Sequence, residues 1–238
     1  MKSSGAANIL VVLAVGLMIV LIAYFFWHVL VFYFQIKRGE AVNLPQFSTQ
    51  SSATAPSDSQ AVYDVVTADD PAFGPPQAQA KVTVVEFADY ECPYCQQASS
   101  IVRSLSLKYQ SSVRFIIRDF PLSQIHPDAL AGAEAAGCAE EQGKFWPMYD
   151  RLFAQNGTLA RTNLDQAAAS IGLDSKAFDQ CLDSHRRLPE IRADQADGTK
   201  AGVVGTPTFF INGQRIAGVI PQDTFEQIIT AALGGQNP

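Results

Sequence analysis

Two cysteines with two residues between them, Cys92-Pro93-Tyr94-Cys95, are the side chains best suited to chemistry in this chain of 238 residues. The apolar run before them, 81–87, predicts a strand, and apolar residues at three- and four-residue steps after them predict an amphipathic helix. The pair therefore begins a helix, where free backbone N–H groups and the positive end of the helix dipole stabilise a thiolate. We expect Cys92 to attack as a thiolate and Cys95 to resolve the mixed disulfide that forms.

Zinc binding is the main alternative use of a C-x-x-C pair. A structural zinc site needs two more ligands, and the remaining candidates are Cys138, Cys181, His126 and His185. None of them belongs to a second C-x-x-C unit or to an H-x-x-x-H unit, so the redox interpretation is favoured and no metal is expected. We interpret His126, which precedes a proline, as a turn residue, and His185 as part of a solvated helix end.

Glu86 lies six residues before Cys92 in an apolar stretch, 84–87 (VVEF), where a charge is costly to bury without a partner. A buried carboxyl with a raised pKa would exchange protons with Cys95 during the redox cycle. In the simpler alternative, strand alternation places Glu86 at an exposed end.

Proline in Gly205-Thr206-Pro207-Thr208 comes at the start of an apolar strand predicted at 206–211. It can simply open that strand, and only about 5% of X-Pro bonds in folded proteins are cis. The residues alone favour this simpler interpretation.

The second cysteine pair, Cys138 and Cys181, lies in an Ala- and Gln-rich region whose pattern predicts helices. As free thiols the two would act as small buried apolar side chains. In an oxidising compartment a leftover pair is expected to bridge, and the chain-entropy model gives such a bridge roughly 3 to 4 kcal/mol. We expect a structural disulfide.

The elements that must position these residues form an α/β pattern. The strand at 81–87, the helix after Cys92 and a strand at 113–117 make a βαβ unit, which implies parallel pairing. Helical text follows to about residue 202, with Phe145 and Trp146 expected in its core. A strand at 206–211, the turn dipeptide Asn212-Gly213, a strand at 214–220 and a final helix complete the pattern.

The N-terminal part differs in composition from the rest. Positions 9–34 contain no charged residue, and 26 residues make a helix of roughly 39 Å, enough to span a bilayer core of about 30 Å. A cleaved signal peptide is the alternative, but its apolar region is shorter. We expect a membrane anchor at 1–38, a flexible linker at 39–60 and a folded domain at 61–238.

Charge excludes one class of function. Positions 39–238 hold 14 of the 17 basic residues and all 23 acidic ones, which gives a net charge of −9. This excludes a protein that binds nucleic acids without sequence specificity, because such binding needs a basic surface. Lys2 on one side of the apolar segment faces Lys37 and Arg38 on the other, so charge does not set the orientation in the membrane.

The sequence resembles the DsbA-like branch of the thioredoxin superfamily through four segments in this order: VVEFADYECPYC, FPLSQIHPDA, AAGCAEEQGKFW and VGTPTFFINGQ. The resemblance covers about residues 69–233 and implies a thioredoxin fold with a helical insert at about 121–202. It implies that Cys92 is the exposed nucleophile, Cys95 its buried partner and Glu86 the buried acid. It also implies a cis Thr206-Pro207 peptide packed beside the disulfide, where the Thr206 backbone would pair with a substrate strand.

The resemblance further implies thiol:disulfide interchange on exported proteins, without a cofactor. The expected partners are unfolded or reduced exported polypeptides and a quinone-linked membrane redox partner. Oxidase activity is favoured over isomerase activity because isomerases of this superfamily usually carry a dimerisation domain, and the linker at 39–60 is too short for one. We therefore expect a monomer. Isomerase or reductase activity, and a non-enzymatic chaperone or metal-binding module, are the alternatives.

This chemistry is useful where disulfides persist, so we expect a single-pass protein of the cell membrane with its catalytic domain on the periplasmic or extracytoplasmic side. One departure from the family pattern affects the redox potential. Tyr94 stands where the best-known strong oxidant has histidine, and Asp89 and Glu91 add negative charge that opposes a thiolate. We expect a couple less oxidising than about −120 mV.

Overall fold

The structure is a computed structural model that describes residues 16–18, 20–27, 30, 65–67 and 70–235. The chain divides into two units, residues 1–55 and 56–238. In the first unit the described residues are helical, and among the described residues no helix has the length and apolar character needed to cross a membrane. The predicted span at 9–34 lies partly outside the described residues, and the predicted linker at 39–60 lies wholly outside them.

The described residues of the second unit form a sheet of five strands and a set of helices. The strands are β1 (Ala72–Phe73), β2 (Val82–Ala88), β3 (Val113–Asp119), β4 (Thr208–Ile211) and β5 (Gln214–Ala217). The helices are η2 (Gln77–Gln79), α2 (Pro93–Lys108), α3 (Ala129–Glu140), α4 (Phe145–Ala154), α5 (Arg161–Ser170), α6 (Ser175–Asp183), α7 (Leu188–Lys200) and α8 (Gln222–Leu233).

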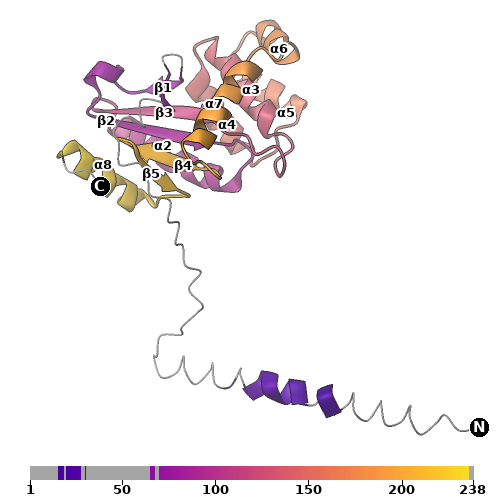
Figure 1. Cartoon of the computed structure of the whole chain (residues 1–238). Helices are drawn as coiled ribbons and strands as arrows, with labels where there is room; N and C mark the ends of the chain where they lie inside the picture. Colours follow the sequence, from indigo (N-terminus) through magenta and orange to yellow (C-terminus); the bar gives the residue numbers. More distant parts are fainter. Residues whose placement is uncertain (1–15, 19, 28–29, 31–64, 68–69, 236–238) are drawn as a thin grey trace, which may run out of the picture. The chain divides into compact units, whose positions relative to one another are not determined.

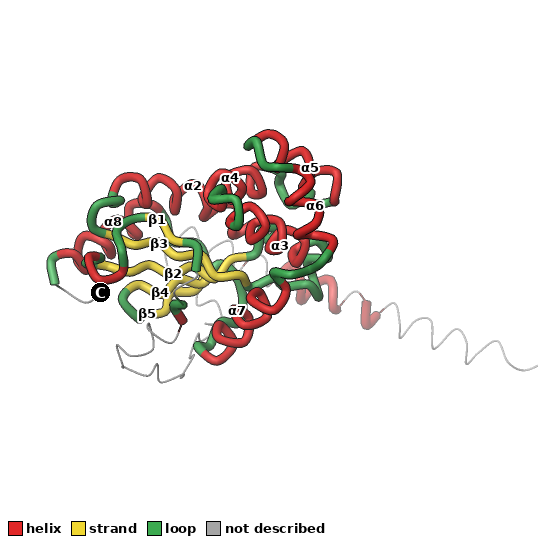
Figure 2. The backbone as a smooth tube through the Cα atoms, turned by 90° about the horizontal axis from the view of Figure 1, so that it is seen from above, coloured by secondary structure: helices red, strands yellow, loops and turns green. Residues whose placement is uncertain are grey.

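The sheet has the order β1-β3-β2-β4-β5, and β2 and β3 pair in parallel as the βαβ pattern predicts. The other neighbours are antiparallel, with Glu86 of β2 opposite Ile117 on one side and Phe209 on the other. Central strand β2 is buried along its whole length, because helices cover both faces of the sheet. Figures 1 and 2 together place α2 and α8 on one face and α7 on the other.

Strand alternation divides the core between these two faces. Val84 and Ala88 point into the larger apolar cluster with Cys95 of α2 and Phe225 of α8. Phe87 points into a smaller cluster on the opposite face, where α7 packs. Glu86 lies two residues from both Val84 and Ala88, so its side chain enters the larger cluster beside the N-terminal half of α2.

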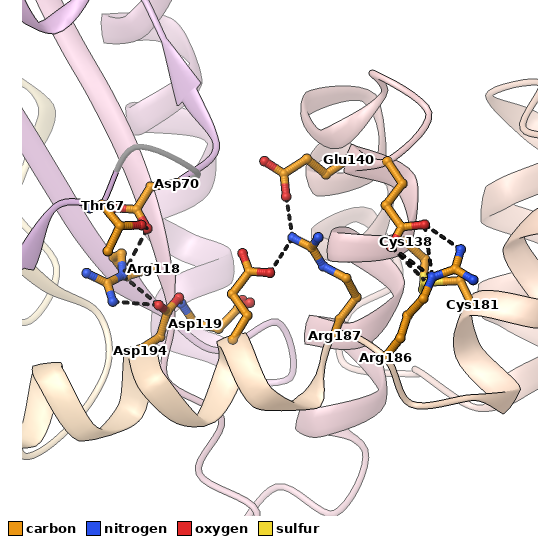
Figure 3. Close-up of polar contacts among 12 residues, drawn as sticks. Thr67, Asp70, Arg118, Asp119, Cys138, Glu140, Cys181, Arg186, Arg187 and Asp194 are labelled. Atoms are coloured by element: carbon orange, nitrogen blue, oxygen red, sulfur yellow. Dashed lines mark hydrogen bonds and ion pairs between the residues drawn. A yellow bond between two sulfur atoms is a disulfide. The ribbon is translucent and has the colours of Figure 1, made fainter.

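The helical insert, α3 to α7, leaves the sheet after β3 and returns to it before β4. The structure contains a disulfide between Cys138 of α3 and Cys181 of α6, the two cysteines expected to bridge. Both residues are buried, and Arg186 lies beside them (Figure 3). Arg186 pairs with Glu141, whose Oε1 is 3.8 Å from the Cys181 sulfur. The disulfide therefore joins two helices of the insert.

A buried arginine connects α7 with the sheet and with the segment that precedes β1. The side chain of Arg118 at the end of β3 has no exposed surface, and its Nε donates to Asp194 Oδ1 at 2.7 Å. It also pairs with Asp70 at 3.3 Å and with Asp197 at 3.0 Å, and it donates to the Val65 carbonyl. Figure 3 shows Asp70 and Asp194 on either side of the guanidinium.

The structure differs from the sequence expectation mainly at element ends. Strand β4 begins at Thr208, two residues later than expected, and β5 ends at Ala217, where Gly218 takes a positive φ of 88°. The short edge strand β1 was not predicted, because its two residues lie in turn-rich text. Asn212 and Gly213 have positive φ values of 45° and 90°, which agrees with the predicted turn between β4 and β5.

Candidate active site

Cys92 caps the N-terminus of α2, and Pro93 occupies the first turn of that helix. Proline fits there because the first helical N–H groups have no partner within the helix. The Cys92 N–H donates to the Asp89 carbonyl at 3.1 Å, which closes the turn between β2 and α2. The backbone of this turn thus fixes where the first sulfur lies.

The Cys92 sulfur lies 3.5 Å from the carbonyl oxygen of Thr206. The residue is only 3% exposed, so the expectation of an exposed nucleophile is wrong for the chain by itself. The physical reason is that the loop before β4 lies against the sulfur, a long-range contact that no local pattern reveals. The neighbouring Tyr94, by contrast, is 64% exposed.

Hydrogen bonds make Cys92 an acidic thiol. The Cys95 thiol is the main donor, and the backbone N–H groups of Cys95 and Tyr94 also contribute. Together they outweigh the opposing effect of burial and lower the pKa of Cys92 from 9.0 to about 5. At neutral pH Cys92 is therefore a thiolate, the form that attacks disulfides.

Cys95 has the opposite character. It is fully buried in the first turn of α2, and burial raises its pKa well above 9.0, with further contributions from the hydrogen bond with Cys92 and from the charge of Glu86. Its sulfur accepts a hydrogen bond from the Asp89 N–H at 3.4 Å. Two sulfurs of one motif are thus held at different protonation states at neutral pH.

Glu86 is buried, with 1% of its surface exposed, so the alternative of an exposed strand end is wrong. Burial raises the pKa of its carboxyl from 4.5 to about 8, and a hydrogen bond donated by the Tyr149 hydroxyl at 3.4 Å opposes this only weakly. Within the part of the chain that the structure describes, its second oxygen, Oε1, has no hydrogen-bond partner. The carboxyl is therefore mostly protonated at neutral pH. When it is charged, it raises the pKa of the Cys95 thiol.

The loop before β4 contains a cis peptide bond between Thr206 and Pro207, not the trans bond that the residues alone favour. The Pro207 carbonyl accepts a hydrogen bond from Gly218 at 2.8 Å, which ties the loop to the segment after β5. The Thr206 carbonyl faces Cys92. Pairing of the Thr206 backbone with a substrate strand remains a prediction.

The sequence identifies Asp89 only as a nearby negative charge and does not connect it with His126. The buried carboxylate of Asp89 accepts hydrogen bonds from the backbone N–H groups of Glu91 and Leu122, each at 2.8 Å. It also contacts His126 Nδ1 at 2.8 Å. The two residues are 37 positions apart, so no local signal connects them.

His126 lies in the turn before α3, as predicted, and the structure also places it at the redox motif. Burial by itself would lower the pKa of its imidazole. The hydrogen bond and charge of Asp89, together with the charges of Cys92 and Glu91, outweigh that effect and raise the pKa above 6.5. His185, in the insert, pairs with Glu134 at 3.0 Å and is not part of the site.

The remaining residues named in the sequence analysis lie in the helical insert, outside the redox motif. Cys138 and Cys181 form a disulfide within the insert, whereas Cys92 and Cys95 are free thiols. Phe145 is buried in the core, as expected. Among the residues that the structure describes, no three His, Cys, Asp or Glu side chains are grouped to hold a metal ion.

Comparison with known proteins shows relatives of the second unit. A family model described as thioredoxin matches residues 67–231. The Na(+)/H(+) antiporter NhaA 3 of Salinispora tropica is 42% identical over 168 residues, which are 67% of this chain and 26% of that protein. The NhaA 1 antiporter of Salinispora arenicola is 40% identical over 157 residues, which are 66% of this chain and 24% of that protein. The chain thus spans about a quarter of the length of these curated relatives.

Solved structures show the same fold. A thioredoxin-like oxidoreductase from Silicibacter pomeroyi DSS-3 is 28% identical with a TM-score of 0.63, and the match covers 75% of this chain and 98% of that one. The thiol-disulfide exchange protein alpha-DsbA2 from Wolbachia pipientis is 19% identical with a TM-score of 0.65, covering 72% and 91%. BdbD from Bacillus subtilis is 22% identical with a TM-score of 0.63, covering 70% and 94%.

Proposed function

Because the chain belongs to the thioredoxin family, we propose that its Cys92–Cys95 couple exchanges disulfides with other polypeptides. The observation that carries this proposal is the difference between the two sulfurs. The pKa of Cys92 is lowered to about 5, whereas that of Cys95 is raised well above its usual value. A reactive dithiol needs one sulfur that attacks and leaves easily and a second that stays out of solvent until a mixed disulfide forms.

In the oxidising direction, a client thiolate attacks Cys92 of the Cys92–Cys95 disulfide. The bond between the two cysteines breaks, and Cys95 leaves with the electron pair and takes a proton. A second client thiolate then attacks the mixed disulfide, and Cys92 leaves as a thiolate. Two electrons pass from the client dithiol to the couple, and the client gains one disulfide. The low pKa of Cys92 makes it a good leaving group in this last step.

Glu86 is the proton donor and acceptor for Cys95 in this proposal. Its carboxyl has a pKa of about 8, so both protonation states are accessible near neutral pH. When Cys95 leaves, protonated Glu86 gives up its proton to the sulfur. In the reverse direction the carboxylate takes that proton back and makes Cys95 a nucleophile.

We propose disulfide formation as the net direction. A thiolate that is stable at neutral pH stabilises the reduced form, and this makes a couple oxidising. A Cys92 pKa of about 5 lies between the values of about 7 and about 3.5 that accompany weakly and strongly oxidising members of the superfamily. The pKa of Cys92 is higher than the value of about 3.5 in the strongly oxidising member, so its thiolate stabilises the reduced form less. This supports the expectation of a couple less oxidising than about −120 mV.

The location and partners are part of the same proposal. An uncharged segment at 9–34 supports a membrane anchor, and the Cys138–Cys181 disulfide supports a compartment where disulfides persist. We therefore propose a monomer in the cell membrane with the redox domain on the extracytoplasmic side. Its clients would be reduced exported polypeptides, and a quinone-linked membrane protein would re-oxidise it.

Insulin reduction and the refolding of reduced ribonuclease test the proposed function. We expect Cys92→Ser to lose both activities and Cys95→Ser to accumulate mixed disulfides with client. The matched control is the double variant Cys138→Ala/Cys181→Ala, which should keep both. If Cys92→Ser retains either activity, the proposed nucleophile is wrong. Holding of unfolded clients without Cys92 would instead indicate a chaperone.

A further inference from the structure

Next to the redox motif, a histidine and a buried carboxylate form a pair that the steps above do not use. Building on the proposed role of Cys92, we propose that His126, held by Asp89, is a positioning residue that places a positive charge beside the Cys92 thiolate. The imidazolium form is favoured while Cys92 is a thiolate and is less favoured when Cys92 is in a disulfide.

Geometry fixes which nitrogen of His126 titrates. Nδ1 lies 2.8 Å from Asp89 Oδ2, and Asp89 is 1% exposed, so this nitrogen carries a hydrogen that it donates to the carboxylate. The backbone N–H groups of Glu91 and Leu122 hold the same carboxylate in place. Proton uptake and loss therefore occur at Nε2, while the ring keeps its orientation.

Asp89 also connects the histidine to both sulfurs. Its carbonyl accepts the hydrogen bond from the Cys92 N–H at 3.1 Å, and its own N–H donates to the Cys95 sulfur at 3.4 Å. One residue thus holds the turn of the redox motif with its backbone and the imidazole with its side chain. The contact between His126 Nδ1 and Asp89 Oδ2 therefore holds the imidazole next to this turn.

The charged and titratable groups around His126 come from three segments. Asp89 and Glu91 lie between β2 and α2, Cys92 lies at the start of α2, and Asp128 lies in the same loop as the histidine. Glu91 is engaged with the Asp128 N–H at 2.7 Å. The charge of Cys92 is one cause of the raised pKa of His126.

Coupling between two sites is reciprocal. If the Cys92 thiolate favours the imidazolium, then the imidazolium favours the thiolate by the same free energy. Formation of the Cys92–Cys95 disulfide removes the negative charge of Cys92 and with it this part of the raised pKa of His126. Reduction of the disulfide then takes up a fraction of a proton at His126 in addition to the protons on the sulfurs.

The first test is the titration of the histidine ring by nuclear magnetic resonance in the full chain, reduced and oxidised at Cys92–Cys95. We expect the pKa of His126 to be higher in the reduced form. His185 is an internal control, because it also pairs with a carboxylate, Glu134, but lies in the insert. The ring signals of His185 should not differ between the two redox forms. Equal pKa values for His126 in the two redox forms would overturn the proposal.

The second test compares His126→Asn with His185→Asn. Asparagine can still donate one hydrogen bond to the partner carboxylate but carries no charge. We expect the pKa of Cys92, followed by thiolate absorbance, to rise by about 0.5 to 1 pH unit in His126→Asn, as for a nearby charge partly screened by water. His185→Asn should leave it unchanged. A folded His126→Asn protein with an unchanged Cys92 pKa would contradict the inference.

The two hypotheses fail in different ways. A Cys92 pKa near that of a free cysteine in the unmodified protein would remove the proposed function itself. A low Cys92 pKa that His126→Asn does not move would leave the proposed function intact and remove only the role of the histidine. If His126→Asn does not fold, the titration of the unmodified protein still decides.

Discussion

Replacing Glu86 by glutamine should stabilise the folded protein, and the gain should depend on pH. The wild-type carboxyl has a pKa of 4.5 when solvated and about 8 in the folded state, because burial disfavours its charge. The folded state therefore binds the proton more tightly than the unfolded state. Stability is highest below pH 4.5 and decreases as the pH rises through 8.

The magnitude follows from this difference in pKa. A shift of about 3.5 units corresponds to a cost of about 5 kcal/mol at high pH, and roughly 3 kcal/mol of it is present at pH 7. Glutamine has the same shape but no charge, so this cost is absent. The difference in the free energy of unfolding between Glu86→Gln and its parent should thus be small near pH 4 and grow to a few kcal/mol at pH 8.

Urea denaturation at a series of pH values measures this difference. Both proteins should carry Cys92→Ala and Cys95→Ala, so that the titration of the thiols does not contribute. Glu226→Gln is a control of opposite sign, because Lys108 and Tyr109 lower the pKa of the Glu226 carboxyl. That variant should lose a little stability at neutral pH and none at low pH. A difference for Glu86→Gln that does not change with pH would refute the buried, protonated carboxyl.

Two further predictions concern stability away from the sulfur couple. The double variant Cys138→Ala/Cys181→Ala should lose about 3 to 4 kcal/mol of unfolding free energy by the chain-entropy model, measured by urea denaturation; a loss below 1 kcal/mol would mean that the insert does not need this bond. Arg118→Met should cost about 3 to 5 kcal/mol at pH 7, because Asp70 and Asp194 would stay buried without their cation. That loss should shrink as the pH falls toward 4, since burial already raises the pKa of both carboxyls; a loss that is independent of pH would show that packing, and not charge, is what Arg118 contributes.

Local pattern predicted the redox motif and its surroundings well. The spacing of apolar residues predicts the strand before Cys92 and the helix after it. Because the two cysteines lie between this strand and this helix, they are expected at the start of the helix. Burial of Glu86 follows from the same pattern only when the strand is known to be central, because alternation by itself allowed an exposed end. The structure shows β2 between β3 and β4, which decides the question.

Contacts between distant segments could not be predicted in this way. His126 meets Asp89, and Thr206 covers the Cys92 sulfur, only because the ends of the insert come back to the motif. Arg118 is an even clearer case. An arginine in a strand is usually exposed, and its complete burial depends on carboxylates from α7 and from the segment before β1.

The helical insert begins and ends at the same place in the fold. Its first loop contacts Asp89 through Leu122, and its last loop brings the Thr206 carbonyl to Cys92. Both loops that connect the insert to the sheet therefore lie next to the redox motif. The outer helices α5 and α6 of the insert lie away from the sheet (Figure 2). Substitutions in α5 and α6 should therefore leave the surroundings of Cys92 unchanged, whereas a change of length in either connecting loop should displace Leu122 or Thr206 from the redox motif.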